Sequence, residues 1–380
     1  MKTCLITSSY PYRGNARGVF IKTLEDNLKF LGVKIILVKP DEKYSDIINP
    51  DGIALSLKRN PTAWFQLIPC IFRLYIKAIK EGKKCDIIHG NWIISTIPCL
   101  ILKKFYKKPT IVTIRGGDIY FVKGKGIFFY IFKYLLNSVD IVVCVGDRLY
   151  EELKKYRKDV EFITNGVPLN DFIPRNKIKM RNKLGLPIKS KLILYSGRLV
   201  EEKGVINLLN AFVEISKSIK DLKLVVNGEG DLISQIKRVI STNNLDDRFI
   251  YIPRLEHKKI SYLMNACDVF VFPRIKEAGS NLLLEAASCG MPIIATDEGY
   301  IGEIIKKDNI LLIDKDVKSL KNALLRVIQD KNLQKELSIK SRKNILEYSC
   351  SWRDNAQKYV KLYNKLLVLK DPMKVKSVIK

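Results

Sequence analysis

Two carboxylates, Glu277 and Glu285, stand eight positions apart in the segment EAGSNLLLEAASCGMPIIAT, residues 277–296. The apolar run DVFVFP that precedes them is typical of a buried parallel strand. Ser280 can cap a helix predicted over 281–289, and a Cys-Gly-Met-Pro sequence ends it. Ligands of open α/β sheets bind beyond the carboxyl edge of the strands, and a helix start there offers free N–H groups to a diphosphate. One carboxylate can then hold a sugar and the other a ribose, with the phosphates between them.

Two cations are predicted at the end of another strand. In YSGRLVEEKG, residues 195–204, Arg198 and Lys203 follow an apolar run. A diphosphate needs countercharge when it leaves water, and arginine offers two parallel hydrogen bonds to it. These two side chains are therefore candidates for binding the phosphates.

The elements that must position these residues form a regular pattern, because short apolar runs alternate with longer amphipathic segments along the chain. The first series of predicted strands comprises residues 3–9, 34–39, 86–90, 109–118, 140–146 and 161–167. The second series comprises residues 191–197, 222–230, 248–253, 268–273, 292–296 and 309–314. The polar, turn-rich segment 174–190 is predicted to be the boundary between two α/β domains.

Together these residues resemble the glutamate–seven residues–glutamate motif of retaining, nucleotide-sugar-dependent glycosyltransferases with the GT-B fold, specifically family four (glycosyltransferase group 1). The resemblance runs from about residue 3 to 367. It implies an α/β fold of two Rossmann-like domains that face each other across a cleft. The N-terminal, acceptor-binding domain is expected over 1–172, with the C-terminal helix of about 351–380 packing back on it, and the donor-binding domain over 188–350.

The resemblance also implies roles for single residues of the donor site. Glu277, Arg198 and Lys203 are expected to be catalytic, with Glu277 on the sugar hydroxyls and the two cations on the diphosphate. Glu285 is expected to hold the ribose. The remaining donor-binding residues that it implies are Gly18, Ser280, Asn281, Leu282 and Gly228. Pro253 and Arg254 stand where the family places a base-contacting loop that ends in glycine, so the base contact is not assigned.

The segment TIRGGD departs from the family. Relatives often carry histidine where Arg115 stands, and arginine cannot act as a general base at neutral pH. Arg115 is a candidate for binding an anionic acceptor, the sugar or the leaving phosphate, and Asp118 for holding an acceptor hydroxyl. His89 resembles another cleft position of the family, and a hydrogen-bonded structural histidine is the alternative.

Metal-binding chemistry is not expected. The pair Asp314 and Asp316 has the spacing found in metal-dependent glycosyltransferases of another fold, but it follows a late strand and is predicted to be a turn. Eight cysteines occur singly and are interpreted as small buried hydrophobic residues, and two histidines leave few ligands for zinc. No metal and no cofactor are expected beyond the nucleoside diphosphate sugar as substrate.

The charge of the chain suggests a partner. Its formal net charge is +28, and residues 58–133 hold 15 basic residues against three acids, with aromatic residues throughout. A basic face with apolar anchors suits an anionic membrane surface, while a solvated lysine-rich face is the alternative. No nucleic acid partner is expected, because no nucleic-acid-binding motif accompanies the charge.

Apolar runs in the sequence are too short to cross a bilayer, which takes about 20 residues, and the N-terminus turns polar after one strand. We expect a cytoplasmic protein, with a peripheral position at the inner face of the cell membrane left open.

The function that follows is that of a retaining hexosyltransferase acting in polysaccharide or glycolipid biosynthesis. It would move a hexosyl group from a nucleoside diphosphate sugar to a hydroxyl of a glycan or lipid-linked acceptor. Two alternatives stay open: a nucleotide-sugar epimerase with a similar cleft, and a non-enzymatic basic protein that binds membranes or nucleic acid.

Overall fold

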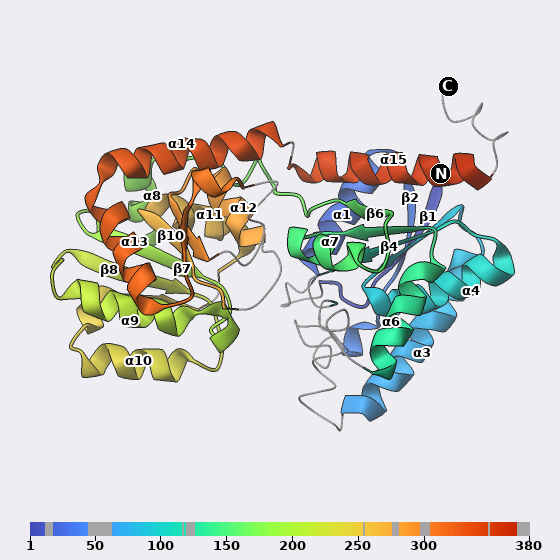
Figure 1. Cartoon of the computed structure of the whole chain (residues 1–380), viewed down its shortest axis with the longest axis horizontal. Helices are drawn as coiled ribbons and strands as arrows, with labels where there is room; N and C mark the ends of the chain where they lie inside the picture. The colour runs from blue at the N-terminus through green and yellow to red at the C-terminus, as the bar shows by residue number, and fades with distance from the viewer. Residues whose placement is uncertain are drawn as a thin grey trace. The chain divides into compact units, whose positions relative to one another are not determined.

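The chain folds into two compact units, each built on a parallel sheet. The computed structural model describes residues 1–11, 18–44, 63–115, 118, 126–253, 255–275, 281–296, 305–348 and 350–370. One unit consists of Met1–Gly166 with Trp352–Lys380, and the other of Val167–Ser351. Each contains a six-stranded parallel sheet covered by helices (Figure 1). The predicted α/β class with two Rossmann-like sheets is therefore confirmed.

The first sheet has the strand order β2-β1-β3-β4-β5-β6. Its strands are β1 (Lys2–Ile6), β2 (Lys34–Val38), β3 (Ile87–Asn91), β4 (Thr110–Ile114), β5 (Ile141–Cys144) and β6 (Val160–Phe162). Every residue of β3, β4 and β5 is buried, as a parallel sheet covered on both faces requires. This explains why continuous apolar runs in the sequence located these strands.

Helices cover both faces of the first sheet. They are α1 (Val19–Phe30), α3 (Ala63–Gly82), α4 (Thr96–Tyr106), α6 (Ile127–Ser138), α7 (Asp147–Lys154) and α15 (Trp352–Lys370), with short 3₁₀ turns η1 (Glu42–Tyr44) and η2 (Ile93–Ser95). Figure 1 shows α15 with α1 on one face and α3, α4 and α6 on the other. Tyr359 and Tyr363 of α15 share a core with Leu24 and Leu28 of α1, so the expected return of the last helix is confirmed.

The second sheet has the order β12-β11-β10-β7-β8-β9. Its strands are β7 (Lys191–Ser196), β8 (Leu222–Asn227), β9 (Phe249–Ile252), β10 (Val269–Phe272), β11 (Ile293–Thr296) and β12 (Leu311–Ile313). The order reverses between β7 and β10, because the chain first builds outward through β8 and β9 and then returns to the other side of β7. Such a reversal is where ligands bind in open α/β sheets.

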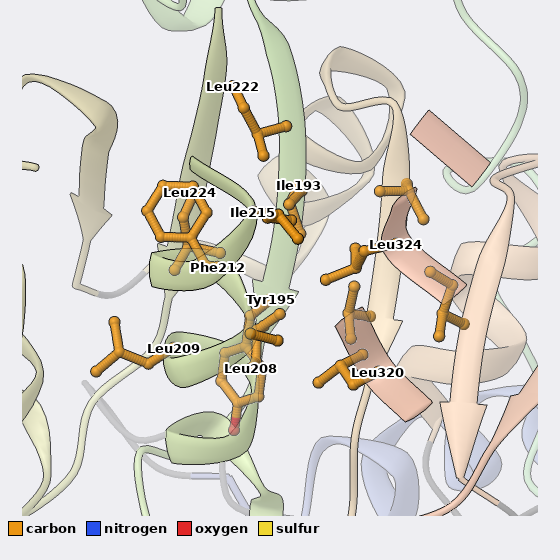
Figure 2. Close-up of a cluster of buried hydrophobic side chains, with 14 of the residues drawn as sticks. Ile193, Tyr195, Leu208, Leu209, Phe212, Ile215, Leu222, Leu224, Leu320 and Leu324 are labelled. Carbon is orange, nitrogen blue, oxygen red and sulfur yellow. The ribbon is translucent and has the colours of Figure 1, made fainter. Parts of the chain in front are cut away.

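Helices also pack on the second sheet. They are α8 (Lys177–Leu184), α9 (Val205–Ser216), α10 (Ile233–Thr242), α11 (His257–Ala266), α12 (Asn281–Ser288), α13 (Val317–Gln329) and α14 (Lys331–Glu347), with 3₁₀ turns η4 (Glu201–Lys203), η5 (Asp246–Arg248) and η6 (Lys307–Asn309). Figure 2 shows Leu208 and Phe212 of α9 and Leu324 of α13 in one cluster with Ile193 and Leu224 of the sheet. This core fixes the strand ends that carry the candidate donor residues.

Helix α8 lies within the segment that was predicted to be a turn-rich boundary. Asn176 caps it by accepting from the Lys179 N–H at 3.0 Å, and Gly185 ends it in the left-handed conformation. Its side chain Arg181 is buried and donates to the carbonyl of Ala266 and to Asp268, each at 2.8 Å. Helix α8 is therefore anchored by a buried arginine whose N–H groups are hydrogen-bonded, and not by a stripe of apolar residues. Because that stripe is absent, the sequence pattern did not predict a helix here.

All eight cysteines are buried, as predicted for small hydrophobic residues. No helix among the residues described above is long and apolar enough to span a bilayer.

Candidate functional site

The loop after β7 carries the two predicted phosphate-binding cations, and backbone hydrogen bonds hold it. The Leu199 N–H donates to the Glu229 carbonyl at 2.9 Å, which pairs this loop with the turn after β8. The Tyr195 hydroxyl donates to the Arg198 carbonyl at 2.8 Å. Arg198 is half-buried and Lys203 is buried, so both cations lie on a loop with a defined course.

Two glycines let this loop pass close to neighbouring strand ends. A Cβ atom on Gly228 would lie 1.9 Å from the Gly197 carbonyl oxygen, and one on Gly204 would lie 1.7 Å from the Pro273 carbonyl oxygen. Gly204 also has φ of 70°, in the left-handed region. Gly228, predicted to contact the donor, is thus required by backbone packing in any case, and its donor contact stays a prediction.

Glu285 is the most deeply buried carboxylate of the candidate donor site. It lies in α12 with 2% of its surface exposed, facing inward as predicted. Its Oε1 is 2.8 Å from the Nε2 of His257, which begins α11. Its Oε2 is buried and has no hydrogen-bond partner within the described part of the chain. A carboxylate with one oxygen occupied and the other unsatisfied is prepared to accept a hydrogen bond from a ligand.

His257 is a site residue that the sequence analysis did not identify. Burial lowers the pKa of this imidazole, but the hydrogen bond that its ring donates to Glu285 and the negative charges of Glu285 and Asp171 outweigh burial and raise its pKa above the ordinary value. Its ring also packs against Phe172, with the centroids 5.2 Å apart. No motif marks His257 in the sequence, and its partner is set by the packing of α11 beside α12.

Other predicted donor residues lie at the same helix or outside the described residues. Asn281 and Leu282 are half-buried in the first turn of α12, one turn before Glu285. Glu277 and Ser280 lie outside the described residues, so their roles stay predictions. Arg254, to which no role was assigned, also lies outside them.

In the first unit, Arg115 is the centre of a buried polar cluster at the carboxyl ends of β3 and β4. It is 4% exposed, and its guanidinium donates to Asn91 Oδ1 at 2.9 Å and to Asn165 Oδ1 at 2.8 Å. It also lies 4.6 Å from the ring centre of Phe20 and 5.7 Å from that of Trp92. The contacts hold the cation in place at the sheet edge where the sequence predicted an anion-binding residue.

Asp118 is bound to the same loop. Its Oδ2 accepts hydrogen bonds from the backbone N–H groups of Arg115 at 3.0 Å and Ile93 at 3.3 Å. Burial nevertheless raises the pKa of this carboxyl to about 7, because these bonds and the Arg115 charge offset only part of the desolvation. The structure therefore brings Arg115 and Asp118 together, and their contacts with an acceptor stay predictions.

His89 has the contacts of a structural histidine. It is completely buried, with Nδ1 2.6 Å from the Tyr363 hydroxyl and Nε2 2.8 Å from the Thr113 hydroxyl. Burial, with the nearby Arg115 charge, lowers its pKa to about 3, so the ring is neutral. These contacts favour the hydrogen-bonded alternative over contact with acceptor or sugar.

Gly18 lies just before α1 with φ of 69°. A Cβ atom there would be 2.7 Å from the Ser9 carbonyl oxygen, so the loop after β1 needs glycine for its own packing. The contact of Gly18 with the donor stays a prediction.

Among the residues that the structure describes, no group of three or more His, Cys, Asp or Glu side chains could hold a metal ion. Asp316 of the Asp-Lys-Asp sequence caps α13, since its carboxylate accepts from the Ser319 N–H at 2.8 Å. The contact is that of a helix N-cap, so Asp316 has a structural role at the start of α13.

Comparisons with known proteins match both units. A model of glycosyltransferase family 4 matches residues 18–171, and a model of glycosyl transferases group 1 matches residues 176–344. The putative teichuronic acid biosynthesis glycosyltransferase TuaC of Bacillus subtilis is 28% identical over 361 residues, which is 86% of this chain and 89% of that protein. The alpha-monoglucosyldiacylglycerol synthase of Streptococcus pneumoniae is 24% identical over 80% of this chain and 73% of its own.

Solved structures agree in fold. Sucrose-phosphate synthase from Thermosynechococcus elongatus superimposes with a TM-score of 0.76 at 20% identity, over 97% of this chain and all of that one. Anabaena Alr3699/HepE in complex with UDP-glucose superimposes with a TM-score of 0.72 at 14% identity, over 96% of this chain and 99% of that one. With two family models that together match nearly all of residues 18–344, the chain belongs to the group 1, family 4 glycosyltransferases and has their GT-B fold.

Proposed function

We propose that the protein transfers a hexosyl group from a nucleoside diphosphate sugar to a hydroxyl of a glycan or lipid-linked acceptor, with retention at the anomeric carbon. The observation that carries this proposal is the buried Glu285 carboxylate, whose Oε2 has no partner within the described residues. An unsatisfied buried acceptor of this kind costs about 1–3 kcal/mol. A ribose hydroxyl of the donor would satisfy it.

The donor is assigned to the second unit. Arg198 and Lys203 hold the diphosphate, Glu285 holds the ribose, and Glu277 holds the sugar hydroxyls. Asn281 and Leu282 stand at the start of α12, where backbone N–H groups favour an anion, and Ser280 keeps its predicted donor-binding role. The UDP and UDP-glucose complexes of HepE make UDP-sugars the first donors to test.

Stabilisation of the leaving group supplies the main catalytic effect. The bond from the anomeric carbon to the phosphate oxygen breaks, and its electron pair leaves with the nucleoside diphosphate. Arg198 and Lys203 neutralise the charge that develops there. The acceptor oxygen bonds to the same face of the anomeric carbon, and its proton passes to the departing phosphate oxygen. These two cations make a metal ion unnecessary for neutralising the phosphates, so the reaction is proposed to be metal-independent.

The acceptor is assigned to the first unit. Arg115 offers a fixed cation to an anionic acceptor, and Asp118 accepts from an acceptor hydroxyl when its carboxyl is ionised. The name of the S. pneumoniae relative describes a glucosyldiacylglycerol product, and that of TuaC describes teichuronic acid biosynthesis. We propose a lipid-linked or membrane-proximal glycan as acceptor, and a peripheral position at the inner face of the cell membrane.

Donor hydrolysis tests this function. The purified protein is incubated without acceptor with UDP-, GDP- and ADP-sugars in the presence of EDTA, and released nucleoside diphosphate is measured. We expect slow release from one donor. Glu285→Gln should raise KM for that donor about tenfold, since a charge-assisted hydrogen bond contributes about 1.5–3 kcal/mol. Glu277→Gln should lower kcat at least about a hundredfold.

The matched control is Glu336→Gln on α14, an exposed glutamate paired with Lys340, which should leave both constants unchanged. Full activity of Glu277→Gln would contradict the site assignment. Release that needs a metal ion would contradict metal independence. Conversion of the donor into an epimeric nucleotide sugar, with no acceptor consumed, would favour the epimerase alternative.

A further inference from the structure

Helix α3 is apolar on two opposite faces. Its inward face packs on the first sheet through Leu67, Cys70, Leu74 and Ala78. Its outward face exposes Phe65, Ile68, Phe72 and Ile76. Phe65 is 85% exposed and Phe72 is 65% exposed. The outward residues follow the i, i+3, i+7, i+11 spacing of one helix stripe. A surface helix of a water-soluble domain normally has a polar outward face, so this second stripe needs a partner.

Helix α6 repeats the pattern. Phe132, Leu135 and Leu136 are buried. Its outward side exposes Ile127, Tyr130, Ile131 and Tyr134 at i, i+3, i+4 and i+7. Two of its neighbouring outward residues, Ile127 and Tyr130, are each 67% exposed. Two helices of one unit therefore carry the same unpartnered apolar stripe.

The two stripes belong to one layer of the structure. Helix α4 packs against both α3 and α6 on the same side of the sheet (Figure 1). The end of α4 adds the exposed Phe105 and Tyr106. These three helices hold more than half of the large hydrophobic side chains that are exposed in the described residues. We call the outward side of α3, α4 and α6 the α3–α6 face. Apolar exposure concentrated in this way marks an interaction surface.

The same three helices carry an excess of basic residues, of which Lys103 is paired with Asp140 at 3.0 Å. The basic residues of the three helices are Arg73, Lys77, Lys80, Lys103, Lys104 and Lys133. Their single acid is Glu81, which pairs with Lys84 at 3.0 Å. The Nζ of Lys83 lies 4.6 Å from the ring centre of Tyr106. The surface thus combines positive charge with apolar and amphipathic side chains. This combination complements an anionic partner better than a basic or neutral one.

We propose that the α3–α6 face docks the protein on an anionic phospholipid bilayer. The apolar stripes enter the boundary between headgroups and acyl chains, the tyrosines lie at the headgroup level, and the lysines pair with anionic headgroups. A second copy of the chain is disfavoured as the occupant, since its own lysines would face these. Docking concerns the first unit and holds whether or not the donor assignment in the second unit is right. Where both hold, a lipid-linked acceptor is presented at the surface that the enzyme occupies.

Vesicle flotation of the full chain tests the docking. Vesicles of phosphatidylcholine alone are compared with vesicles that also contain phosphatidylglycerol, at low and high salt. We expect binding to the anionic vesicles that weakens with salt. The double variant Phe65→Ser with Phe72→Ser should lower the partition coefficient at least about tenfold, because two phenyl groups that would leave water on docking are removed. Lys77→Glu with Lys80→Glu should weaken binding to anionic vesicles only.

Phe30→Ser is the matched control, because Phe30 is also exposed in the first unit but lies on α1. It should bind like the unaltered protein. All these variants should keep donor hydrolysis without acceptor, and Glu285→Gln should keep vesicle binding, so the two proposals can fail separately. Unchanged flotation of the phenylalanine double variant would overturn the docking proposal. So would a dimer in solution that this variant dissociates while neither protein binds vesicles.

Discussion

At the scale of single residues, the pair of Glu285 and His257 carries the most information. In the proposed donor site, the Glu285 carboxylate needs one fixed orientation to bind ribose hydroxyls. The imidazole takes up Oε1, at 2.8 Å, and leaves Oε2 for the ligand. The hydrogen bond and the negative charge of Glu285 also raise the pKa of His257 and so favour the charged imidazolium.

This pair predicts a pH-dependent stability. The folded-state pKa of His257 lies above its unfolded value of about 6.5, so its contribution is fully present below that pH and is lost as pH rises through the folded pKa. The difference in melting temperature between the unaltered protein and His257→Gln should therefore shrink as the pH rises from about 6 to about 9. Differential scanning fluorimetry over that series measures it.

Lys259→Gln, on the same helix and exposed, is the control and should give a difference that does not vary in this way. A glutamine side chain can still donate a hydrogen bond to Oε1 of Glu285, whereas leucine cannot. His257→Gln should therefore retain more affinity for the nucleotide sugar than His257→Leu. Equal affinity of the two variants would contradict a positioning role for His257.

At the scale of elements, the loop between β7 and α9 depends on the closeness of Gly204 to the end of β10. Gly204→Ala should destabilise the protein by more than about 2 kcal/mol and raise donor KM, because the added Cβ would meet the Pro273 carbonyl and displace the loop of Arg198 and Lys203. Chemical denaturation and donor kinetics measure the two effects.

Gly185→Ala is the control that separates the cost of a left-handed backbone conformation from the cost of a steric clash. Gly185 also has a left-handed φ, of 65°, but an added Cβ would meet no atom within 4 Å. This variant should cost only about 1 kcal/mol and leave donor KM unchanged. Equal losses for the two glycines would show that the close approach to Pro273 does not matter.

The elements that could be predicted from the sequence are those with a clear local pattern of apolar residues. Buried parallel strands such as β5 and β10 were predictable because sheet residues covered on both faces are apolar without interruption. Helix α8 was not, since its stability comes from Arg181 and partners distant in sequence. Likewise, the apolar residues of α3 did not reveal which of them face solvent, and His257 gained its meaning only from α12. Glu285 was predicted correctly as an inward-facing carboxylate.

At the scale of the whole molecule, the first unit is completed by the last helix. Tyr363 and Tyr359 of α15 bind His89 and Thr113 from positions 274 and 246 residues away in the sequence. Ending the chain after Ser351 should therefore unfold residues 1–166 while 167–351 stay folded, because the first core would lose its aromatic residues and leave buried polar groups unpaired.

Amide hydrogen exchange with mass spectrometry tests this prediction. Peptides of the first sheet should lose their protection in the shortened chain, and peptides of β7 and β8 should keep it. A chain ended after Lys370 retains all of α15 and should match the full chain in both sheets. Full protection of β3 and β4 without α15 would contradict the prediction.

The late position of α15 reverses the usual order of biosynthesis. A ribosome delivers the N-terminal sheet first, and domains generally fold in the order in which they emerge. Here the second unit is continuous in sequence and can finish as soon as Ser351 has left the exit tunnel, while the sheet made first still lacks its covering helix. The first unit must therefore wait for α15, and until that helix has emerged from the ribosome the uncovered core of the first sheet is the part of the nascent chain that most needs a chaperone.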